Sequence, residues 1–335
     1  MKKKKQLCTR VSGMVAALAL ILTGCGGGGD SIALGNVPAL YWAAWSATNT
    51  ALEDGEGDLD VEAVQFKSSA DVFVAMRSDD VQVASMGMNV MVNGLVENPD
   101  TPMQMIAGVS PGRSQIIVRD QSEIGDWSDL KGKNLGVIRG STDELIFKIA
   151  LAHNDIDMDQ DTTITTLQAP ADLLLALRNG DIDAAVTYQP YTAQAVKDGV
   201  AEMPEDMNTE MTEWASVPTG IYASDDLIES DPESVQKIVD TFVAETRKFD
   251  DKNVWVDTAL KYQAGDRDLL LTALEDDKPW FLMEEDKLGS MAKAMAEFGA
   301  VPDDVSGELR DRVNYDFLSK STGMSPEELG KSEGN

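Results

Sequence analysis

The residues best suited to chemistry in this chain are hydroxyl, amide and aromatic side chains in loops that follow expected strands. Hydroxyls and unpaired backbone N–H groups at a helix start donate hydrogen bonds, and the helix dipole adds positive potential there. Such loops suit a sulfonate, a carboxylate or another oxyanion without a buried lysine. Aromatic side chains beside them could stack on an apolar or cationic part of a ligand. The candidate ligand-binding residues are Trp42, Trp45, Ser68, Ser69, Asn89, Ser110, Arg113, Gly140, Ser141, Thr142, Tyr188 and Gln189.

Most of these candidates also have a purely structural interpretation. Ser69 and Ser141 are equally typical of helix caps, and Asn89 is typical of a turn. Trp42 and Trp45 fit a hydrophobic core as well as they fit the wall of a binding site. The sequence alone leaves both interpretations open at these positions.

The small number of histidine and cysteine residues limits the enzymatic and metal-binding functions that this chain could have. The chain has one histidine and two cysteines, fewer than the usual zinc site needs. A Ser-His-Asp triad would have to use His153, which follows an apolar helical stretch and is typical of a helix C-terminus. The glycine run 26–29 follows no strand and opens no helix, so it does not predict a phosphate-binding loop. We therefore expect that the protein is not an enzyme and that it binds neither a metal nor a cofactor.

The charge balance excludes another class of function. The 335 residues include 28 Lys+Arg and 58 Asp+Glu, which gives a formal net charge of -30. Such a chain repels phosphate, so we expect no nucleic-acid partner. The acidic residues are distributed, which favours solvated acidic faces suited to a saline exterior. Arg113 fits a surface charge, but it also flanks a candidate loop in a chain short of positive charge.

The N-terminus predicts export and a lipid anchor. Basic residues at 2–5 and Arg10 precede an apolar run, 11–21, that is too short to span a bilayer. The run ends in Leu-Thr-Gly-Cys at 22–25, which resembles the lipobox of bacterial lipoproteins. We expect residues 1–24 to be a signal peptide, Cys25 to be lipidated, and 25–31 to form a glycine-rich tether. Cleavage would remove five basic and no acidic residues, so the net charge would fall from −30 to −35.

Short apolar runs alternate with helical patterns over most of the remaining chain, which predicts an α/β fold. Helix starts are marked by Ser141 with Glu144 in a capping-box pattern, by Pro170, and by Pro232. From about residue 225 onward the pattern is almost wholly helical. The expected strands are 31–35, 59–66, 81–86, 103–109, 115–118, 134–138, 162–167, 184–188 and 219–223.

Several segments resemble periplasmic solute-binding proteins of the taurine, sulfonate, nitrate and pyrimidine-precursor family. They are 129–137 with Gly140 and Ser141, then 170–172, 176–177, 180–184 and 188–190. The resemblance implies a two-lobed type II periplasmic-binding fold, each lobe a mainly parallel sheet flanked by helices. It implies lobe limits of 32–115 with 220–335 and of 116–219, with a hinge near Ile116 and Gly220.

The resemblance also implies a function. The protein would be a monomeric, lipid-anchored extracytoplasmic binding protein, exported to the cell membrane and facing the periplasm or cell exterior. It would capture a small polar solute, most simply taurine, a sulfonate or a similar anion, and deliver it to the permease and ATPase of an ABC importer. Family members often carry an acidic residue where this chain has Gln189, so an ammonium would not be recognised by a carboxylate there.

Three alternatives remain open from the sequence. The first is a tethered sensor that binds the same solutes without transporting them. The second is a binding protein for pyrimidine precursors of the thiamine pathway, with the same fold. The third is a pyrimidine synthase of that fold, which needs a histidine that it consumes and a cysteine-rich iron site. The single histidine and the export signal argue against the enzyme.

Overall fold

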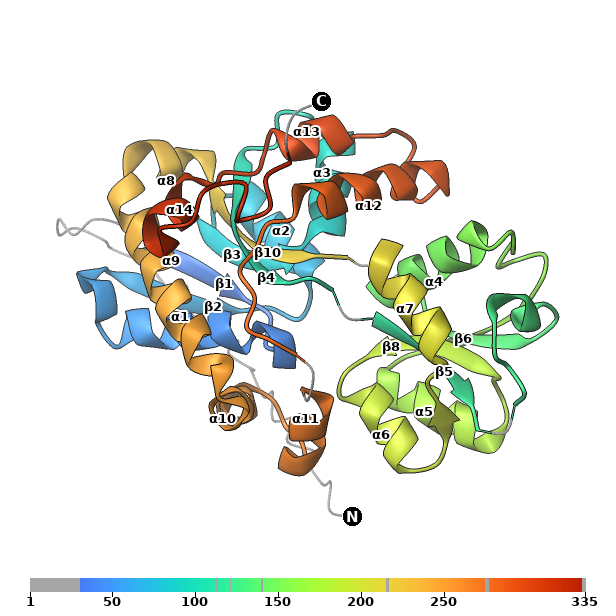
Figure 1. Ribbon diagram of the computed structural model, residues 1–335. Helices are drawn as coiled ribbons and strands as arrows, with labels where there is room; N and C mark the ends of the chain where they lie inside the picture. Colours follow the sequence, from blue (N-terminus) through green and yellow to red (C-terminus); the bar gives the residue numbers. More distant parts are fainter. Residues whose placement is uncertain are drawn as a thin grey trace, which may run out of the picture. The chain divides into compact units, whose positions relative to one another are not determined.

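The computed structural model describes residues 31–112, 114–120, 122–139, 141–214, 217–274 and 277–332. These residues form two lobes, each built on a five-stranded sheet flanked by helices (Figure 1). The expected signal peptide and Cys25 lie outside the described residues, as do Arg113 and Gly140. Within the described ranges, no helix is both long and apolar enough to cross a bilayer.

The sheet of the first lobe contains strands from the beginning of the chain and one strand that returns to it much later. Its strand order is β2-β1-β3-β10-β4, and β10 runs antiparallel to both of its neighbours. The other pairings, β1 with β2 and β1 with β3, are parallel. The bounds are β1 (Ile32–Asn36), β2 (Val61–Gln65), β3 (Val83–Gly87), β4 (Met103–Ser110) and β10 (Thr219–Ser224).

The sheet of the second lobe has the same plan. Its order is β7-β6-β8-β5-β9, with β6 parallel to β7 and β8, and with β5 antiparallel to β8 and β9. One strand therefore runs against the rest in each sheet, which agrees with the mainly parallel sheets expected from the sequence. The bounds are β5 (Ser114–Arg119), β6 (Asn134–Ile138), β7 (Thr163–Leu167), β8 (Ala184–Tyr188) and β9 (Ala201–Glu202).

Helices surround both sheets, and those after β10 belong to the first lobe. Short 3₁₀ helices are η1 (Leu40–Trp42), η2 (Glu56–Asp58), η3 (Trp127–Leu130) and η4 (Lys248–Asp250). The second lobe carries α4 (Thr142–His153), α5 (Pro170–Asn179), α6 (Tyr191–Lys197) and α7 (Glu205–Trp214). The first lobe carries α1 (Ala43–Glu53), α2 (Ser69–Arg77), α3 (Met88–Glu97), α8 (Asp225–Ser230), α9 (Pro232–Arg247), α10 (Lys252–Tyr262), α11 (Arg267–Ala273), α12 (Glu285–Glu297), α13 (Ser306–Arg310) and α14 (Asp316–Thr322).

Local chemistry explains where the main helices begin and end. Ser141 is the N-cap of α4, and its Oγ accepts a hydrogen bond from the Glu144 N–H at 3.1 Å. Pro170 occupies the first turn of α5, which ends at Gly180 in the left-handed conformation with φ 76°. Pro232 likewise opens α9, and Asp231 caps it. The helix starts predicted from the sequence are confirmed at these positions.

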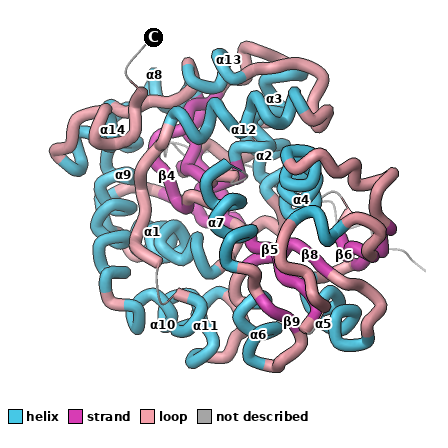
Figure 2. The backbone as a smooth tube through the Cα atoms, turned by 45° about the vertical axis from the view of Figure 1, so that its right-hand side comes forward, coloured by secondary structure: helices cyan, strands magenta, loops and turns pink. Residues whose placement is uncertain are grey.

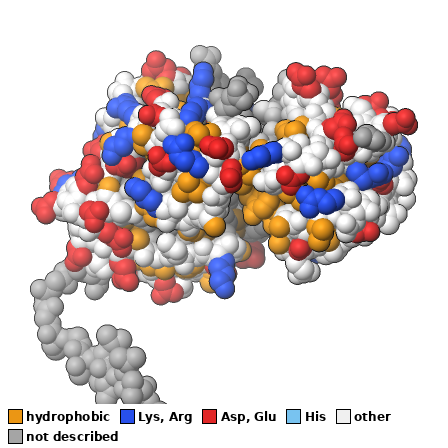
Figure 3. All heavy atoms as spheres, turned by 90° about the horizontal axis from the view of Figure 1, so that it is seen from below, with side chains coloured by type: hydrophobic (Ala, Val, Ile, Leu, Met, Phe, Trp, Pro, Cys, Tyr) orange, Lys and Arg blue, Asp and Glu red, His pale blue; other side chains and the backbone are white. Residues whose placement is uncertain are grey.

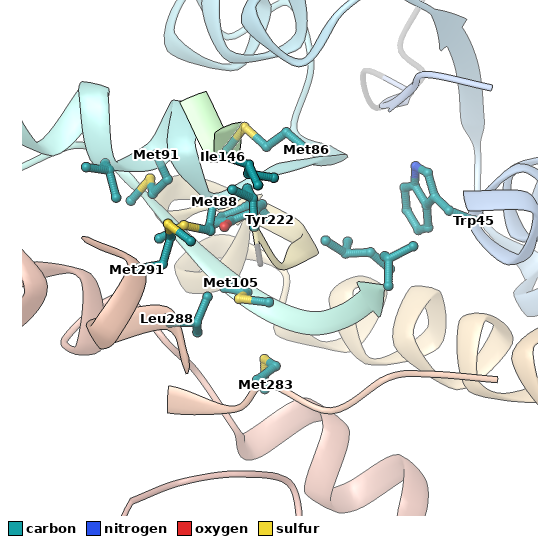
Figure 4. Packing of buried hydrophobic residues seen from close by; sticks show 14 of the residues in the cluster. Trp45, Met86, Met88, Met91, Met105, Ile146, Tyr222, Met283, Leu288 and Met291 are labelled. Atoms are coloured by element: carbon teal, nitrogen blue, oxygen red, sulfur yellow. The ribbon is translucent and has the colours of Figure 1, made fainter. Parts of the chain in front are cut away.

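Buried apolar side chains hold the first lobe together, and methionine is prominent among them. Figure 4 shows Met86, Met88 and Met91 from β3 and α3 in the same cluster as Tyr222 of β10. All four side chains are fully buried. Methionine fills irregular gaps between helices and sheet because its chain is unbranched and flexible. The methionine group at 86–91 is therefore part of the hydrophobic core.

The chain passes between the lobes twice. The first passage joins β4 to β5, and the second joins α7 to β10. The two passages touch, because a Cβ on Gly112 would lie 2.6 Å from the carbonyl oxygen of Val217. Farther from these passages, α11 of the first lobe lies beside α6 of the second (Figure 2), and Lys197 approaches Asp266 at 3.8 Å.

Candidate functional site

A cavity of about 470 Å³ lies between the two lobes, beyond the carboxyl ends of strands from both sheets. In α/β sheets this is where loops and helix N-termini converge and where ligands bind. Seen from below, hydrophobic side chains gather along the junction of the lobes, whereas acidic side chains are spread over both (Figure 3). The cavity is lined by Val37, Pro38, Ala39, Tyr41, Trp42, Lys67, Ser69, Gly87, Asn89, Ser110, Gly112, Ser114, Ser141, Thr142, Asp143, Ile146, Tyr188, Val217 and Thr219.

Three helices begin at this cavity. Ser69 is the first residue of α2, Asn89 lies in the first turn of α3, and Ser141 caps α4, with Thr142 following it. The N-terminus of a helix carries unpaired N–H groups and a partial positive charge. Three such ends, from two lobes, therefore give the cavity a positive and hydrogen-bond-donating wall.

Hydroxyl groups add donors to that wall. The Oγ atoms of Ser69, Ser110 and Ser141 accept backbone N–H groups at 3.2, 3.2 and 3.1 Å, from Gly87, Gly112 and Glu144 respectively. Since the oxygen is used as an acceptor, the hydroxyl hydrogen stays available to a ligand oxygen. Thr219 also lines the cavity, and its Oγ1 is buried without a partner among the described residues. The wall is thus prepared for an acceptor-rich group.

Seven of the twelve residues proposed from the sequence line this cavity. They are Trp42, Ser69, Asn89, Ser110, Ser141, Thr142 and Tyr188. Two more, Arg113 and Gly140, lie outside the described residues.

The remaining three candidates do not line the cavity. Trp45 is fully buried on α1, where its indole N–H donates to the Gly35 carbonyl at 2.8 Å, so it belongs to the core. Ser68 caps α2, with its Oγ accepting the Asp71 N–H at 3.2 Å. Gln189 donates through Nε2 to Gln115 Oε1 at 3.2 Å and accepts the Ala193 N–H. Each of these side chains already has a structural partner.

Two charged residues of the cavity were missed in the sequence. Lys67 follows the end of β2 and directly precedes the candidate pair Ser68-Ser69. This position next to two candidates is the feature of the sequence that could have indicated Lys67 as a cavity residue. Asp143 lies two residues after the cap Ser141. Acidic residues are common at this position because they interact with the helix dipole, and they are ordinarily solvated. Nothing in its neighbours along the chain shows that this acid is buried.

The electrostatic environment of Asp143 is unusual for the second residue of a helix. The residue is 7% exposed, and Ser114 Oγ donates to its Oδ1 at 2.6 Å. Burial raises the pKa of Asp143 to about 6, although the hydrogen bond from Ser114 opposes the rise. The pKa of Tyr188 is raised to about 12, first by burial and then by the charges of Asp143 and Tyr191. A carboxylate and a phenol thus share the same partly desolvated wall.

The described residues give no support for a metal site, since no group of three or more His, Cys, Asp or Glu side chains is placed to hold an ion. The described lining of the cavity includes neither histidine nor cysteine. The side chains present can bind, orient and neutralise a charged ligand by hydrogen bonds and fixed charges.

The sequence profile of the NMT1-like family matches residues 31–259, which is more than half of the chain. The chain belongs to this family. The taurine-binding periplasmic protein of Escherichia coli (strain K12) is 29% identical to this NMT1-like protein over 169 residues, 49% of this chain and 51% of that protein. A putative aliphatic sulfonates-binding protein of Bacillus subtilis (strain 168) is 25% identical over 210 residues, 59% and 62% of the two chains. The chain spans between half and two thirds of the length of these relatives.

Solved structures resemble this NMT1-like protein in fold. The periplasmic aliphatic sulphonate binding protein SsuA from Escherichia coli has a TM-score of 0.70 at 19% identity, covering 85% of this chain and 92% of its own. The desulfurization enzyme DSZB has a TM-score of 0.62 at 16% identity, covering 88% and 99%. The two-lobed periplasmic-binding α/β fold and the resemblance inferred from the sequence are confirmed. One of these two proteins is an enzyme and the other is a binding protein, so the shared fold alone does not assign a function.

Proposed function

We propose that this protein is the extracytoplasmic solute-binding component of an ABC importer and that its ligand carries an oxyanion. The observation that supports this function is the convergence of the N-termini of α2, α3 and α4 on one interlobe cavity, together with Lys67. Helix N-termini bind sulfonate, phosphate and carboxylate groups through backbone N–H groups and the dipole. A lysine adds a full positive charge to the same wall.

Short-range contacts have to supply the binding energy. The chain has a formal net charge of -30, so its long-range field repels anions. Hydrogen bonds to a charged acceptor contribute about 1.5–3 kcal/mol each, and their effect does not depend on the distant field. Ser69 in the first lobe and Ser141 in the second could hold the same ligand from opposite sides.

Small sulfonates are the first candidates for the ligand. The relatives named for taurine and for aliphatic sulfonates favour this class, with nitrate-like anions and pyrimidine precursors behind it. The cavity of about 470 Å³ falls in the usual range of small-molecule sites, roughly 300–1,000 Å³. Val37, Trp42 and Ile146 give it apolar walls that suit the hydrocarbon part of an alkanesulfonate.

A binding role also fits the side chains better than an enzymatic one. The described cavity lining offers neither a thiol nor an imidazole as nucleophile or general base. We therefore propose that the protein binds its ligand without changing it. We propose further that it is exported, lipid-anchored and monomeric, and that the two lobes have the limits 32–115 with 220–335 and 116–219.

The ligand class is tested by thermal unfolding and calorimetry on the soluble protein that starts at residue 31. Taurine, ethanesulfonate, nitrate, sulfate and a thiamine-precursor pyrimidine are the probes. A true ligand at 100 times its dissociation constant should stabilise the protein by about 2.7 kcal/mol. The variant Lys67→Gln should weaken sulfonate binding, whereas Lys131→Gln, which removes the same charge away from the cavity, should not. Absence of binding by every anion would contradict the oxyanion site.

The lipid anchor is tested by Cys25→Ala in the full-length chain. Because the Cys25 thiol is the proposed acylation site, this variant should move from the detergent phase to the aqueous phase in a Triton X-114 separation. Cys8→Ala, which falls in the proposed signal peptide, is the matched control and should leave the partition unchanged. A Cys25→Ala protein that still enters the detergent phase would disprove the anchor.

A further inference from the structure

A buried carboxylate faces a cavity whose other polar groups suit an anion. Asp143 lines the cavity on the side of the second lobe, while Lys67 and Ser69 line it on the side of the first. Asp143 is 7% exposed, and among the described residues its carboxylate accepts a hydrogen bond from Ser114 at 2.6 Å. An ionised carboxylate at the same wall as an anionic ligand would repel that ligand unless a cation lies between them.

The described part of the chain does not supply that cation. Among its ion pairs, which join lysine or arginine nitrogens to carboxylate oxygens within 4.0 Å, none includes Asp143. The neighbouring acid of the same helix, Glu144, is paired with Arg139 at 2.7 Å and lies outside the cavity lining. A buried carboxylate with a single neutral donor is costly, and a charged partner would relieve that cost.

A purely structural role explains this placement poorly. An acid in the first turn of a helix gains from the helix dipole, but that gain does not require the acid to be buried. Ser141 already caps α4 by accepting the Glu144 N–H, and no described hydrogen bond joins the Asp143 carboxylate to a backbone N–H of that helix. The hydroxyl of Ser114 fixes one carboxylate oxygen, Oδ1, and leaves Oδ2 for a further donor.

We propose that the ligand of this protein carries an ammonium group as well as an oxyanion, and that Asp143 binds the ammonium and thereby selects zwitterions over simple anions. This inference rests on the proposed function and specifies its ligand class. The anion would lie between the starts of α2 and α4, near Lys67 and Ser141, and the ammonium would lie toward Oδ2 of Asp143 and Tyr188. The phenol ring of Tyr188 on the same wall offers a face or an oxygen to the cation.

An ammonium fits this carboxylate better than a metal ion does. Asp143 is the one carboxylate in the described lining of the cavity, and a divalent cation held by protein oxygens needs several anionic or carbonyl ligands. An alkylammonium needs one strong acceptor, and its remaining hydrogens can be shared with water or hydroxyls. A zwitterion has no net charge, so the overall negative charge of the protein repels it less than it repels a simple anion.

Two matched pairs of probes separate the amine from the anion. Taurine and ethanesulfonate differ by one amine, as do β-alanine and propionate. With the wild-type protein, the amine-bearing member of whichever pair binds should bind at least about tenfold more tightly. Asp143→Asn keeps the shape and the acceptor for Ser114, so it should weaken the amine-bearing probe at least about tenfold and leave the amine-free probe nearly unchanged.

Glu144→Gln is the control variant because it removes a charge from the next residue of α4 without touching the cavity lining. It should keep the preference for the amine. Equal affinity for both members of a pair, or an unchanged preference in Asp143→Asn, would overturn the inference while leaving the oxyanion site intact. Binding of neither pair by the wild-type protein would overturn the proposed function first, and the inference with it. The unliganded melting temperature of each variant shows whether it is folded.

Discussion

At the scale of single residues, Asp143 combines a cost in stability with a gain in selectivity. Burial raises the pKa of its carboxyl to about 6, whereas the carboxyl of an unfolded chain ionises near pH 3.8. The folded state therefore holds this proton more tightly, and the stability that it contributes is lost as the pH rises from about 4 through 6. Binding sites often retain groups that destabilise the empty protein.

The first prediction follows from that pKa. A rise of about two pKa units corresponds to roughly 3 kcal/mol, so Asp143→Asn should stabilise the unliganded protein by up to about that amount at pH 8. The advantage should shrink toward pH 4, because the wild-type carboxyl is then protonated. The other titratable side chains near Asp143 are Lys67 and Tyr41, which line the same cavity, and Tyr188 of β8, which interacts with Asp143 and with Tyr191. Urea unfolding at pH 4, 6 and 8 measures the difference, and a gain that does not depend on pH would contradict this account.

Ser141 and Ser68 separate the two roles that a serine at a helix start can have. Both cap a helix, but Ser141 lines the cavity and Ser68 does not. Ser141→Ala and Ser68→Ala should each lower the unfolding free energy by about 1 kcal/mol, the usual effect of a lost cap. Of the two variants, only Ser141→Ala should also reduce ligand affinity, by roughly ten- to a hundredfold, because the oxyanion of the ligand loses a hydrogen bond. Calorimetry that shows an unchanged affinity would make Ser141 a structural cap.

At the scale of secondary-structure elements, the sequence located the strands well. The ranges 134–138 and 184–188 agree with β6 and β8 at both ends, and 219–223 falls one residue short of β10. Apolar runs bounded by turn residues specify such strands locally. The two-residue strand β9 was missed because its pairing with β5 comes from the tertiary fold and not from its own sequence.

The candidate site was less predictable, for a physical reason that the pair Trp42 and Trp45 illustrates. Trp42 ends η1 and lines the cavity, while Trp45 lies three residues later on α1 and is fully buried. The direction of each side chain depends on where the helix starts, which the loop before it does not reveal. Lys67 and Asp143 were missed for a related reason, since whether a charged side chain lines the cavity depends on the tertiary fold and not on its neighbours along the chain.

The loops between the lobes provide the prediction at this scale. Gly112 has φ +85°, and an added Cβ would lie 2.6 Å from the Val217 carbonyl oxygen of the other passage. Gly132 has φ +77° with nothing within 4 Å of its Cβ position, so it shares the backbone strain without the clash. Gly132→Ala should cost about 1–2 kcal/mol, and Gly112→Ala about 1–3 kcal/mol more. Only Gly112→Ala should also change ligand affinity, because it separates the two passages. Equal effects of the two variants in thermal unfolding and calorimetry would refute this hinge contact.

At the scale of the whole molecule, the net charge of the protein repels anions, whereas the cavity between the lobes favours them. Acidic side chains are spread over both lobes, so the lobes repel each other and repel anions at long range (Figure 3). The cavity offsets this field locally by gathering helix N-termini and Lys67. A ligand with both charges meets little net repulsion and can neutralise Lys67 on one lobe and Asp143 on the other.

That bridging predicts closure of the lobes around the ligand. The lobes are joined by two passages, a geometry that permits hinge motion, and the ligand would contact Lys67 in one lobe and Asp143 in the other. Because the bridged form gains contacts that the open form lacks, saturating taurine should shift the population toward a more compact state. Small-angle X-ray scattering should show a smaller radius of gyration with taurine than without it. Asp143→Asn, at the same taurine concentration, should remain closer to the unliganded value. An identical radius with and without taurine, at a concentration where calorimetry shows full occupancy, would mean that the cavity binds its ligand without moving the lobes.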